Sequence, residues 1–220
     1  SPGFINMLSW AYSSLMEDGR SLSDLKQGVT LEVFGEGVSP GPYVKDGKRH
    51  SFKEAMEALE NNGVSTNIAS FLGATTARMM EVGFENRPAT KKEMQRMREM
   101  VRRSMDEGAM GIGSSLIYAP ADYAPTEELV ELCRAAAEKG GMYISHMRNE
   151  DNLLMEALEE LITISREANI PAEIYHLKAS REANWHMLDS LIKRVEQVRE
   201  EGLEITADIY TYNASSTGLT

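Results

Sequence analysis

Residues 140–150, GGMYISHMRNE, join an apolar run to a histidine and then to polar residues, and residues 171–179, PAEIYHLKA, repeat that order further along the chain. Side chains alternate between the two faces of a β-strand, so His146 and His176 are each predicted to share a strand face with apolar residues. Each histidine then ends its strand. A helical pattern separates the two runs, which predicts two parallel strands joined by a helix.

The same rhythm of strand and helix runs along the whole chain. Seven runs have the character of strands, at residues 3–10, 28–35, 63–73, 108–118, 140–146, 171–179 and 202–210. Four clear amphipathic helices are predicted, at residues 90–108, 126–140, 154–164 and 188–202. Connections this short imply parallel strands with right-handed crossovers. A doubly wound open sheet and a (β/α)₈ barrel both fit that rhythm.

The glycine-rich segment at residues 34–42, FGEGVSPGP, bears on the choice between these folds. No helical pattern directly follows it, which argues against the phosphate-binding turn of an open nucleotide-binding sheet. Several strands carry polar residues near their carboxyl ends, where the active sites of barrels lie. We therefore predict an α/β fold of the (β/α)₈ TIM-like barrel type, incomplete, with about seven βα units, and residues 1–220 as a single domain. Residues 41–50 are predicted to form an exposed loop.

Charge and composition exclude several classes of partner. The chain has 23 Lys and Arg against 34 Asp and Glu, a net charge of -11, which repels nucleic-acid phosphates and anionic membranes. We expect no nucleic-acid and no membrane partner. Neither a membrane-spanning apolar run nor a signal-peptide pattern is visible.

Cys133 is the single cysteine, which excludes an internal disulfide and favours a reducing, cytoplasmic location. Its neighbours predict a buried position on a helix.

The two strand-terminal histidines are candidate metal ligands. Side chains at the ends of neighbouring barrel strands meet at the barrel mouth, and two imidazoles there suit a divalent ion of the zinc type with a third carboxylate or thiolate ligand. Glu36, between two glycines after the second strand, is the best carboxylate candidate, and a turn role competes with it. The alternative for His146 and His176 is a pair of hydrogen-bonded core histidines, and the residues alone leave both interpretations open. His50 and His186 are expected to have surface or packing roles.

Four further residues are candidates for binding a substrate. Lys178, two positions past His176, is predicted to reach the same pocket, where a cation can bind a carboxylate; a salt bridge at the strand end is its alternative. Tyr118 and Tyr210 end the fourth and seventh strands and offer hydroxyls to a polar group. Arg148 is the fourth candidate, with orientation of the metal ligands or capping of the next helix as alternatives.

Six segments that occur in order carry a family resemblance: SPGFINMLSWA, QGVTLEVFGEG, EGAMGIGSSLIYAP, GGMYISHMRNE, AEIYHLKAS and EITADIYTY. Together they resemble the N-acyl-D-amino-acid deacylase (D-aminoacylase) branch of the amidohydrolase superfamily over essentially the whole chain. The resemblance implies a zinc-dependent hydrolase of N-acyl-D-amino acids on a distorted barrel. It implies that His146 and His176 bind the tighter zinc, about one ion per chain, and that Lys178 helps to bind the substrate.

The chain departs from the family pattern at three places. The positions of the family's His-x-His pair read Leu8, Ser9 and Trp10, so the second metal site is expected to be absent or severely weakened. The family's cysteine ligand lies in a GNCG turn after strand two, where this chain reads GEGV, and Glu36 is the candidate to substitute as an oxygen ligand. The family's catalytic aspartate ends strand eight, so the resemblance places the general acid/base beyond Thr220 and no catalytic residue within this chain.

The resemblance further implies that the β-sandwich segments and strand eight lie outside the 220 residues. We therefore expect the chain by itself to have little or no hydrolase activity. Two alternatives stay open: a relative specialised for cyclic amides or dipeptides, and a non-catalytic barrel scaffold. The preferred D-amino acid, the acyl group and the oligomeric state have no signature in the sequence.

Overall fold

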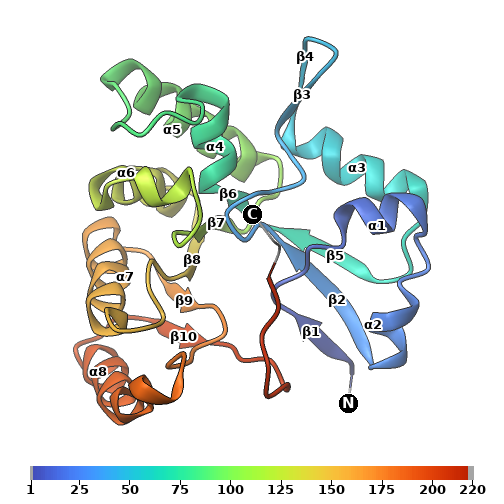
Figure 1. Ribbon diagram of the computed structural model, residues 1–220. Helices are drawn as coiled ribbons and strands as arrows, with labels where there is room; N and C mark the ends of the chain where they lie inside the picture. Colours follow the sequence, from blue (N-terminus) through green and yellow to red (C-terminus); the bar gives the residue numbers. More distant parts are fainter. Residues whose placement is uncertain (1, 218–220) are drawn as a thin grey trace.

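The computed structural model describes residues 2–217 (Figure 1). The strands of this part are β1 Phe4–Asn6, β2 Val29–Phe34, β3 Tyr43–Lys45, β4 Lys48–His50, β5 Asn67–Ser70, β6 Leu72–Gly73, β7 Gly111–Ser115, β8 Met142–His146, β9 Ala172–Ile174 and β10 Ile205–Ala207. The α-helices are α1 Tyr12–Glu17, α2 Leu22–Lys26, α3 Phe52–Asn62, α4 Ala74–Glu81, α5 Lys91–Asp106, α6 Thr126–Ala137, α7 Leu154–Ala168 and α8 Leu188–Glu200, with 3₁₀ turns η1 Ala121–Tyr123 and η2 Glu182–Met187. None of the helices in this part is long and apolar enough to span a lipid bilayer.

Two parallel sheets follow one another in chain order. The first has the order β1-β2-β5 and the second β6-β7-β8-β9-β10, and only Phe71 separates β5 from β6. Figure 1 shows the strands in an arc with the main helices on its outer side. The predicted α/β class and parallel strands are therefore confirmed, with each predicted strand run containing an observed strand. The barrel does not close over the described residues, because β1 and β10 each pair with a strand on one side only.

The four helices that the sequence predicted are found as α5, α6, α7 and α8. The predicted capping box begins α5: the hydroxyl of Thr90 accepts from the backbone N–H of Glu93, and the Glu93 carboxylate accepts from the backbone N–H of Thr90. Met97 and Val101 of this helix are fully buried. The shorter helices α1 to α4 were not predicted.

Residues 41–50 form a hairpin instead of the loop that the sequence indicated. β3 and β4 pair antiparallel, and the turn between them has Asp46 and Gly47 at φ 51° and 73°. An Asp-Gly pair with positive φ at both residues is the turn that two-residue hairpins prefer. The charged residues on both sides concealed this signal, because they removed the usual apolar alternation.

The core has two main layers, on the two faces of the strands. The larger cluster lies between the strands and helices α4 to α8, and it includes the single cysteine, Cys133, whose thiol pKa burial raises well above its usual range. The smaller cluster, on the inner face of the strands, is built on Val33, Phe71, Ile144 and Tyr175. This inner cluster lies next to the strand ends that carry the predicted metal ligands.

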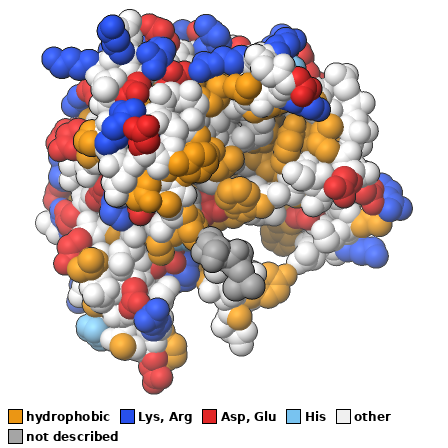
Figure 2. All heavy atoms as spheres, turned by 45° about the horizontal axis from the view of Figure 1, so that its top comes forward, with side chains coloured by type: hydrophobic (Ala, Val, Ile, Leu, Met, Phe, Trp, Pro, Cys, Tyr) orange, Lys and Arg blue, Asp and Glu red, His pale blue; other side chains and the backbone are white. Residues whose placement is uncertain are grey.

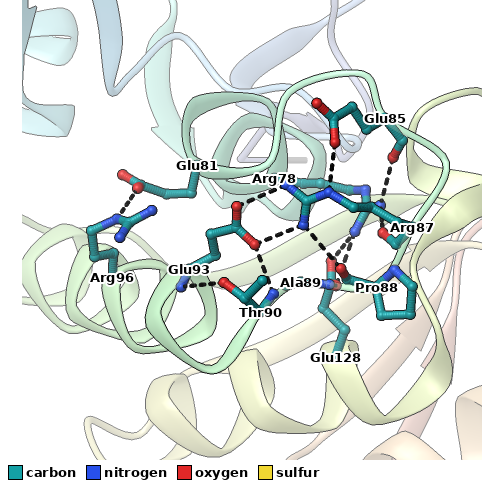
Figure 3. Close-up of polar contacts among 10 residues, drawn as sticks. All are labelled: Arg78, Glu81, Glu85, Arg87, Pro88, Ala89, Thr90, Glu93, Arg96 and Glu128. Atoms are coloured by element: carbon teal, nitrogen blue, oxygen red, sulfur yellow. Dashed lines mark hydrogen bonds and ion pairs between the residues drawn. The ribbon is translucent and has the colours of Figure 1, made fainter.

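A buried ion pair joins α4 to α6 (Figure 3). The Arg78 guanidinium donates to both carboxylate oxygens of Glu128, at 2.8 and 2.9 Å, and its other terminal nitrogen donates to the backbone carbonyls of Glu85 and Arg87. Arg78 is 1% exposed and Glu128 4% exposed. Arg78 therefore holds the loop between α4 and α5 in place as well as the neighbouring helix α6.

Candidate metal centre

Glu36 projects from a turn that only glycines can form. It follows β2 between Gly35 at φ 109° and Gly37 at φ 70°. A Cβ atom on Gly35 would lie 2.5 Å from the Phe71 carbonyl oxygen, and one on Gly37 would lie 2.9 Å from the Ser115 Cβ. Both positions need glycine for conformation and for space. The turn delivers the Glu36 carboxylate, 8% exposed, to the carboxyl ends of the strands.

The two histidines reach the same place by different routes. His146 is the last residue of β8 and lies on its inner face, as strand alternation predicted. For β9 the alternation was wrong by one position, because Ile174 packs against the helices and Tyr175 faces the inner cluster. His176 then adopts a left-handed conformation, φ 39°, one residue beyond Ile174 and Tyr175. This backbone turn, and not the strand face, brings its imidazole beside His146.

Glu36, His146 and His176 form a group of potential metal ligands. Nδ1 of His146 lies 2.8 Å from Oε1 of Glu36 and 3.2 Å from Nε2 of His176, and this Nε2 lies 3.9 Å from the same Oε1. Ligand bonds of about 2.0–2.2 Å would put neighbouring ligand atoms of a tetrahedral zinc about 3.3–3.6 Å apart. Two of the three separations are shorter than this range and one is longer, so shifts of about 0.5 Å or less would bring the three atoms to the spacing of one face of a zinc tetrahedron.

Hydrogen bonding alone does not satisfy these atoms. A ring nitrogen carries either a hydrogen or a lone pair, so Nδ1 of His146 can donate to Glu36 or accept from His176 but cannot do both. Nε2 of His146 is buried and has no hydrogen-bond partner among the described residues. A cation would instead receive an electron pair from each of the three residues at once. The donor set therefore fits a divalent ion of the zinc type.

The charges around the cluster are arranged to keep Glu36 ionised. Burial acts to raise its pKa, but hydrogen bonds from His146, His176 and Trp10 outweigh burial and lower the pKa to about 2. Burial also disfavours the charged form of His176, yet its hydrogen bonds to Glu150 and Glu36 raise the pKa to about 9. The group thus holds a carboxylate and an imidazole that strongly attract positive charge.

Glu150 and Lys178 lie against the outer nitrogen of His176. Nδ1 of His176 is 2.8 Å from Oε1 of Glu150, and the Lys178 ammonium lies 2.7 Å from Glu150 and 2.9 Å from the same Nδ1. When Nδ1–H donates to the Glu150 carboxylate, the Nε2 lone pair is left facing the cluster. Lys178 thus has both the predicted salt bridge and the predicted position beside the site.

Trp10 is a contact of the site that the sequence interpretation missed. Its indole Nε1–H donates to Oε2 of Glu36 at 2.5 Å, although the side chain is 60% exposed. Trp10 was predicted not to ligate a metal, and this is correct, because an indole N–H is a donor only. No periodic pattern marks a hydrogen bond between residues 26 positions apart.

A cavity of about 860 Å³ opens beside the cluster. Figure 2 shows hydrophobic side chains gathered around the hollow of this face, with most charged side chains farther out. Lys178 is the one Lys or Arg among the described lining residues. The apolar part of the lining includes Ile5, Trp10, Val38, Ile117 and Ile209.

Both predicted tyrosines line this cavity. The ring of Tyr118 meets His146 edge-on at 5.5 Å between centroids, and its hydroxyl lies 2.9 Å from Oγ1 of Thr217. The ring of Tyr210 lies 5.6 Å from the Lys178 ammonium, close enough for a cation–π contact. The structure thus brings Tyr118, Tyr210 and Lys178 together around the cluster.

Arg148, the fourth substrate-binding candidate, does not reach the cavity. Its guanidinium pairs with both carboxylate oxygens of Glu160 at 2.8 Å and donates to the carbonyls of Asp122 and Ala124. It is absent from the described cavity lining. Arg148 instead ties the loop after η1 to helix α7. Strand alternation does not extend to Arg148, because β8 ends at His146.

Asp208, just past β10, also lines the cavity. Its Oδ1 accepts from the backbone N–H of His176 at 2.6 Å, while Oδ2 is buried without a hydrogen-bond partner among residues 2–217. Burial raises the pKa of this carboxyl, and the His176 backbone contact opposes that effect. Asp208 therefore fixes the unusual backbone at His176.

Comparison with known proteins shows which proteins this chain is similar to. No family model matches the chain. The chain is 30% identical to D-aminoacylase of Alcaligenes xylosoxydans xylosoxydans, in a match that covers 100% of this chain and 48% of that protein. This chain is a homologue of the D-aminoacylases. It spans about half the length of the curated relatives that it matches.

Solved structures give the same result. D-aminoacylase, which defines a subset of amidohydrolases and has a binuclear metal centre, superposes with a TM-score of 0.86 at 29% identity, over 96% of this chain and 48% of that chain. N-acyl-D-glutamate deacylase from Bordetella bronchiseptica, solved with zinc and a phosphonate inhibitor, gives a TM-score of 0.88 at 27% identity with the same coverage, 96% and 48%. The predicted D-aminoacylase resemblance is confirmed.

Proposed function

We propose that this D-aminoacylase homologue supplies the metal-binding part of a zinc-dependent amidohydrolase, which cleaves N-acyl-D-amino acids to a carboxylate and a D-amino acid. The observation that carries the proposal is the convergence of Glu36, His146 and His176 at the carboxyl ends of three parallel strands. A zinc ion held there would polarise the amide carbonyl and activate water. The names of the relatives support this substrate class.

The residues of this chain divide the remaining tasks. Glu36 would contribute a negative charge and the two histidines one nitrogen donor each, with His176 releasing its proton when a cation binds, which gives a three-ligand set with room for a substrate. Glu150 holds the ring of His176 by its Nδ1. The largely apolar wall of the cavity lowers the local polarity beside the ligands, which strengthens electrostatic contacts there.

The substrate carboxylate is proposed to bind near Lys178. Lys178 is the one Lys or Arg in the described cavity lining, and its contacts with Glu150 and His176 keep its ammonium beside the cluster. An ammonium has three donors, so a further anion can be bound. The hydroxyls of Tyr118 and Tyr210 are proposed to bind the same carboxylate together with Lys178, since the Tyr210 ring lies beside this ammonium.

The complete reaction is proposed to need residues outside this sequence. The chain spans 48% of the first relative, and the sheets leave β1 and β10 unpaired on one side within the described part. We propose that the whole protein closes these strands into a (β/α)₈ barrel and provides the group that transfers the proton. The chain alone is then expected to hydrolyse N-acyl-D-amino acids slowly or not at all.

Metal content gives the first test. The purified protein is expected to bind about one zinc per chain. His146→Ala is expected to weaken zinc binding by more than about 100-fold. The loss of a residue that only supports a metal ligand already weakens metal binding by about 10- to 100-fold, and the loss of a direct ligand should weaken it more. Calorimetric titration with zinc and elemental analysis measure both. His186→Ala is the matched control, because this exposed histidine in η2 lies outside the metal-ligand group and, among the described residues, its side chain hydrogen-bonds to the Ala183 carbonyl.

A protein that binds no zinc at any concentration would contradict the proposal and favour a non-catalytic barrel. Activity is tested on the full-length protein with N-acyl-D-, N-acyl-L- and cyclic amide substrates. Hydrolysis of the N-acyl-D substrates alone supports the proposed reaction, whereas turnover of cyclic amides alone would replace it with the cyclic-amide alternative.

A further inference from the structure

The hydrogen bond between Trp10 and Glu36 links two elements at the mouth of the cavity. The indole Nε1 lies 2.5 Å from Oε2 of Glu36, while Oε1 faces the two histidines. Glu36 is held on both sides, since one oxygen points to the exposed indole and the other into the buried cluster. The indole is therefore a direct contact of a proposed metal ligand.

A buried polar cluster fixes the loop that carries Trp10. Ser9 donates its hydroxyl to the Glu32 carboxylate at 2.8 Å, and its backbone N–H bonds to the Val33 carbonyl at 2.8 Å. Glu32 is fully buried and also accepts from the hydroxyls of Ser21 and Thr66. The loop after β1 is thus fastened to β2, the strand that leads to Glu36. Trp10 and Glu36 are positioned by the same strand.

The indole limits what the Glu36 carboxylate can do. An indole N–H is a donor only, so it can hold a carboxylate oxygen but cannot bind a cation. A second cation bridged by Glu36 would have to approach Oε2, where the indole lies. The metal-ligand group found in the described residues ends with Glu36, His146 and His176, so no further His, Cys, Asp or Glu of residues 2–217 joins them there.

We propose that Trp10 is a positioning residue of the metal centre. Its indole N–H holds Oε2, so that Glu36 offers Oε1 alone to a single divalent cation shared with His146 and His176. This inference rests on the proposed metal-binding function. It adds a residue that sets both the affinity of the site for metal and the limit of one ion.

The bond itself is tested without any metal. The chain has two tryptophans, Trp10 and Trp185, so the ¹H–¹⁵N spectrum contains two indole signals, which Trp185→Phe assigns. The Trp10 indole proton is expected to lie downfield, as in a charge-assisted hydrogen bond, and to move upfield in Glu36→Gln. An indole signal that is the same in Glu36→Gln and in the parent protein would overturn the inference.

Zinc affinity tests the consequence of the bond. Trp10→Phe keeps an aromatic ring and removes the N–H, and it is expected to weaken zinc binding by about 10- to 100-fold while the stoichiometry stays at about one. Trp185→Phe, at an exposed position in η2 outside the cavity lining, is the control and is expected to bind zinc like the parent. Thermal unfolding of both variants checks that each is folded.

The outcomes separate this inference from the proposed function. If the parent binds about one zinc and Trp10→Phe binds it equally tightly, the inference fails and the proposed function stands. Two zinc ions per chain, both lost in Glu36→Gln, would also overturn it. If the parent binds no zinc, the proposed function fails, and the indole spectrum still decides whether Trp10 holds Glu36. If Trp10→Phe does not fold, the same spectrum decides.

Discussion

At the scale of single residues, the geometry of the site depends on backbone conformations that most residues avoid. Gly35 and Gly37 flank Glu36 with positive φ, and His176 itself is left-handed. The hydrogen bond from the His176 N–H to Asp208 stabilises that conformation. Strand alternation can place His146, but it cannot reveal a left-handed histidine. The two histidines are neighbours as predicted, but the left-handed backbone of His176, and not its strand face, brings them together.

Replacing Gly37 by alanine is expected to disturb both folding and metal binding. A left-handed alanine costs about 1–2 kcal/mol of unfolding free energy, and the new methyl group would in addition lie 2.9 Å from the Ser115 Cβ. The turn must shift, so zinc affinity should fall. Chemical denaturation and zinc titration measure the two effects.

Gly47→Ala is the matched control, because Gly47 has φ 73° and no atom within 4 Å of the new methyl position. Gly47→Ala should lower the unfolding free energy by the same amount, about 1–2 kcal/mol, and should bind zinc as tightly as the parent protein. Equal zinc affinity in Gly37→Ala and Gly47→Ala would show that the Glu36 turn tolerates a side chain.

At the scale of elements, the sequence predicted best where a stripe of apolar residues was long. Helices α5 to α8 and the parallel strands were found, because repeated apolar positions determine which face packs inward. The short helices α1 and α2, with 6 and 5 residues, carry too few turns for a periodic signal. Helix α3 was missed despite the capping box of Ser51 and Glu54, which is a readable signal.

The ion pair between α4 and α6 is expected to be important for stability (Figure 3). Arg78→Met would leave the Glu128 carboxylate buried without its partner, and breaking such a pair typically costs about 3–5 kcal/mol. Arg102→Met removes an exposed pair with Glu138 and should cost at most about 1 kcal/mol. Denaturant unfolding of both variants makes the comparison. A similar small loss in each would mean that water reaches Glu128 in the folded protein.

At the scale of the whole molecule, the open arc of strands leaves two edges. β1 and β10 each lack a partner on one side within residues 2–217, and Phe4 on β1 is 61% exposed. Unpaired edges with apolar side chains favour association between chains. The arc of parallel strands agrees with the predicted barrel in part, because it does not close within residues 2–217. Its closure could not be decided from the period of the sequence, because each βα unit looks alike whether or not the ends meet.

Phe4→Lys is therefore expected to reduce self-association of the chain. A charge on an edge strand opposes pairing with a second chain, so the concentration-dependent increase in sedimentation coefficient should become smaller. Phe84→Lys is the control, since Phe84 is 72% exposed but lies in the loop after α4. Unchanged sedimentation of Phe4→Lys, or an equal effect of both variants, would remove the β1 edge as the cause.

The burial of Cys133 makes the native protein nearly inert to thiol chemistry. Only the thiolate reacts, and this thiol is 0% exposed, with burial raising its pKa. A thiol-modifying reagent in solution can therefore reach Cys133 only after α6 separates from the core. The rate of modification measures how often the fold opens, without any introduced label. Because Cys133 stays unreactive in the native protein, a cysteine introduced at the surface would be labelled at that position alone.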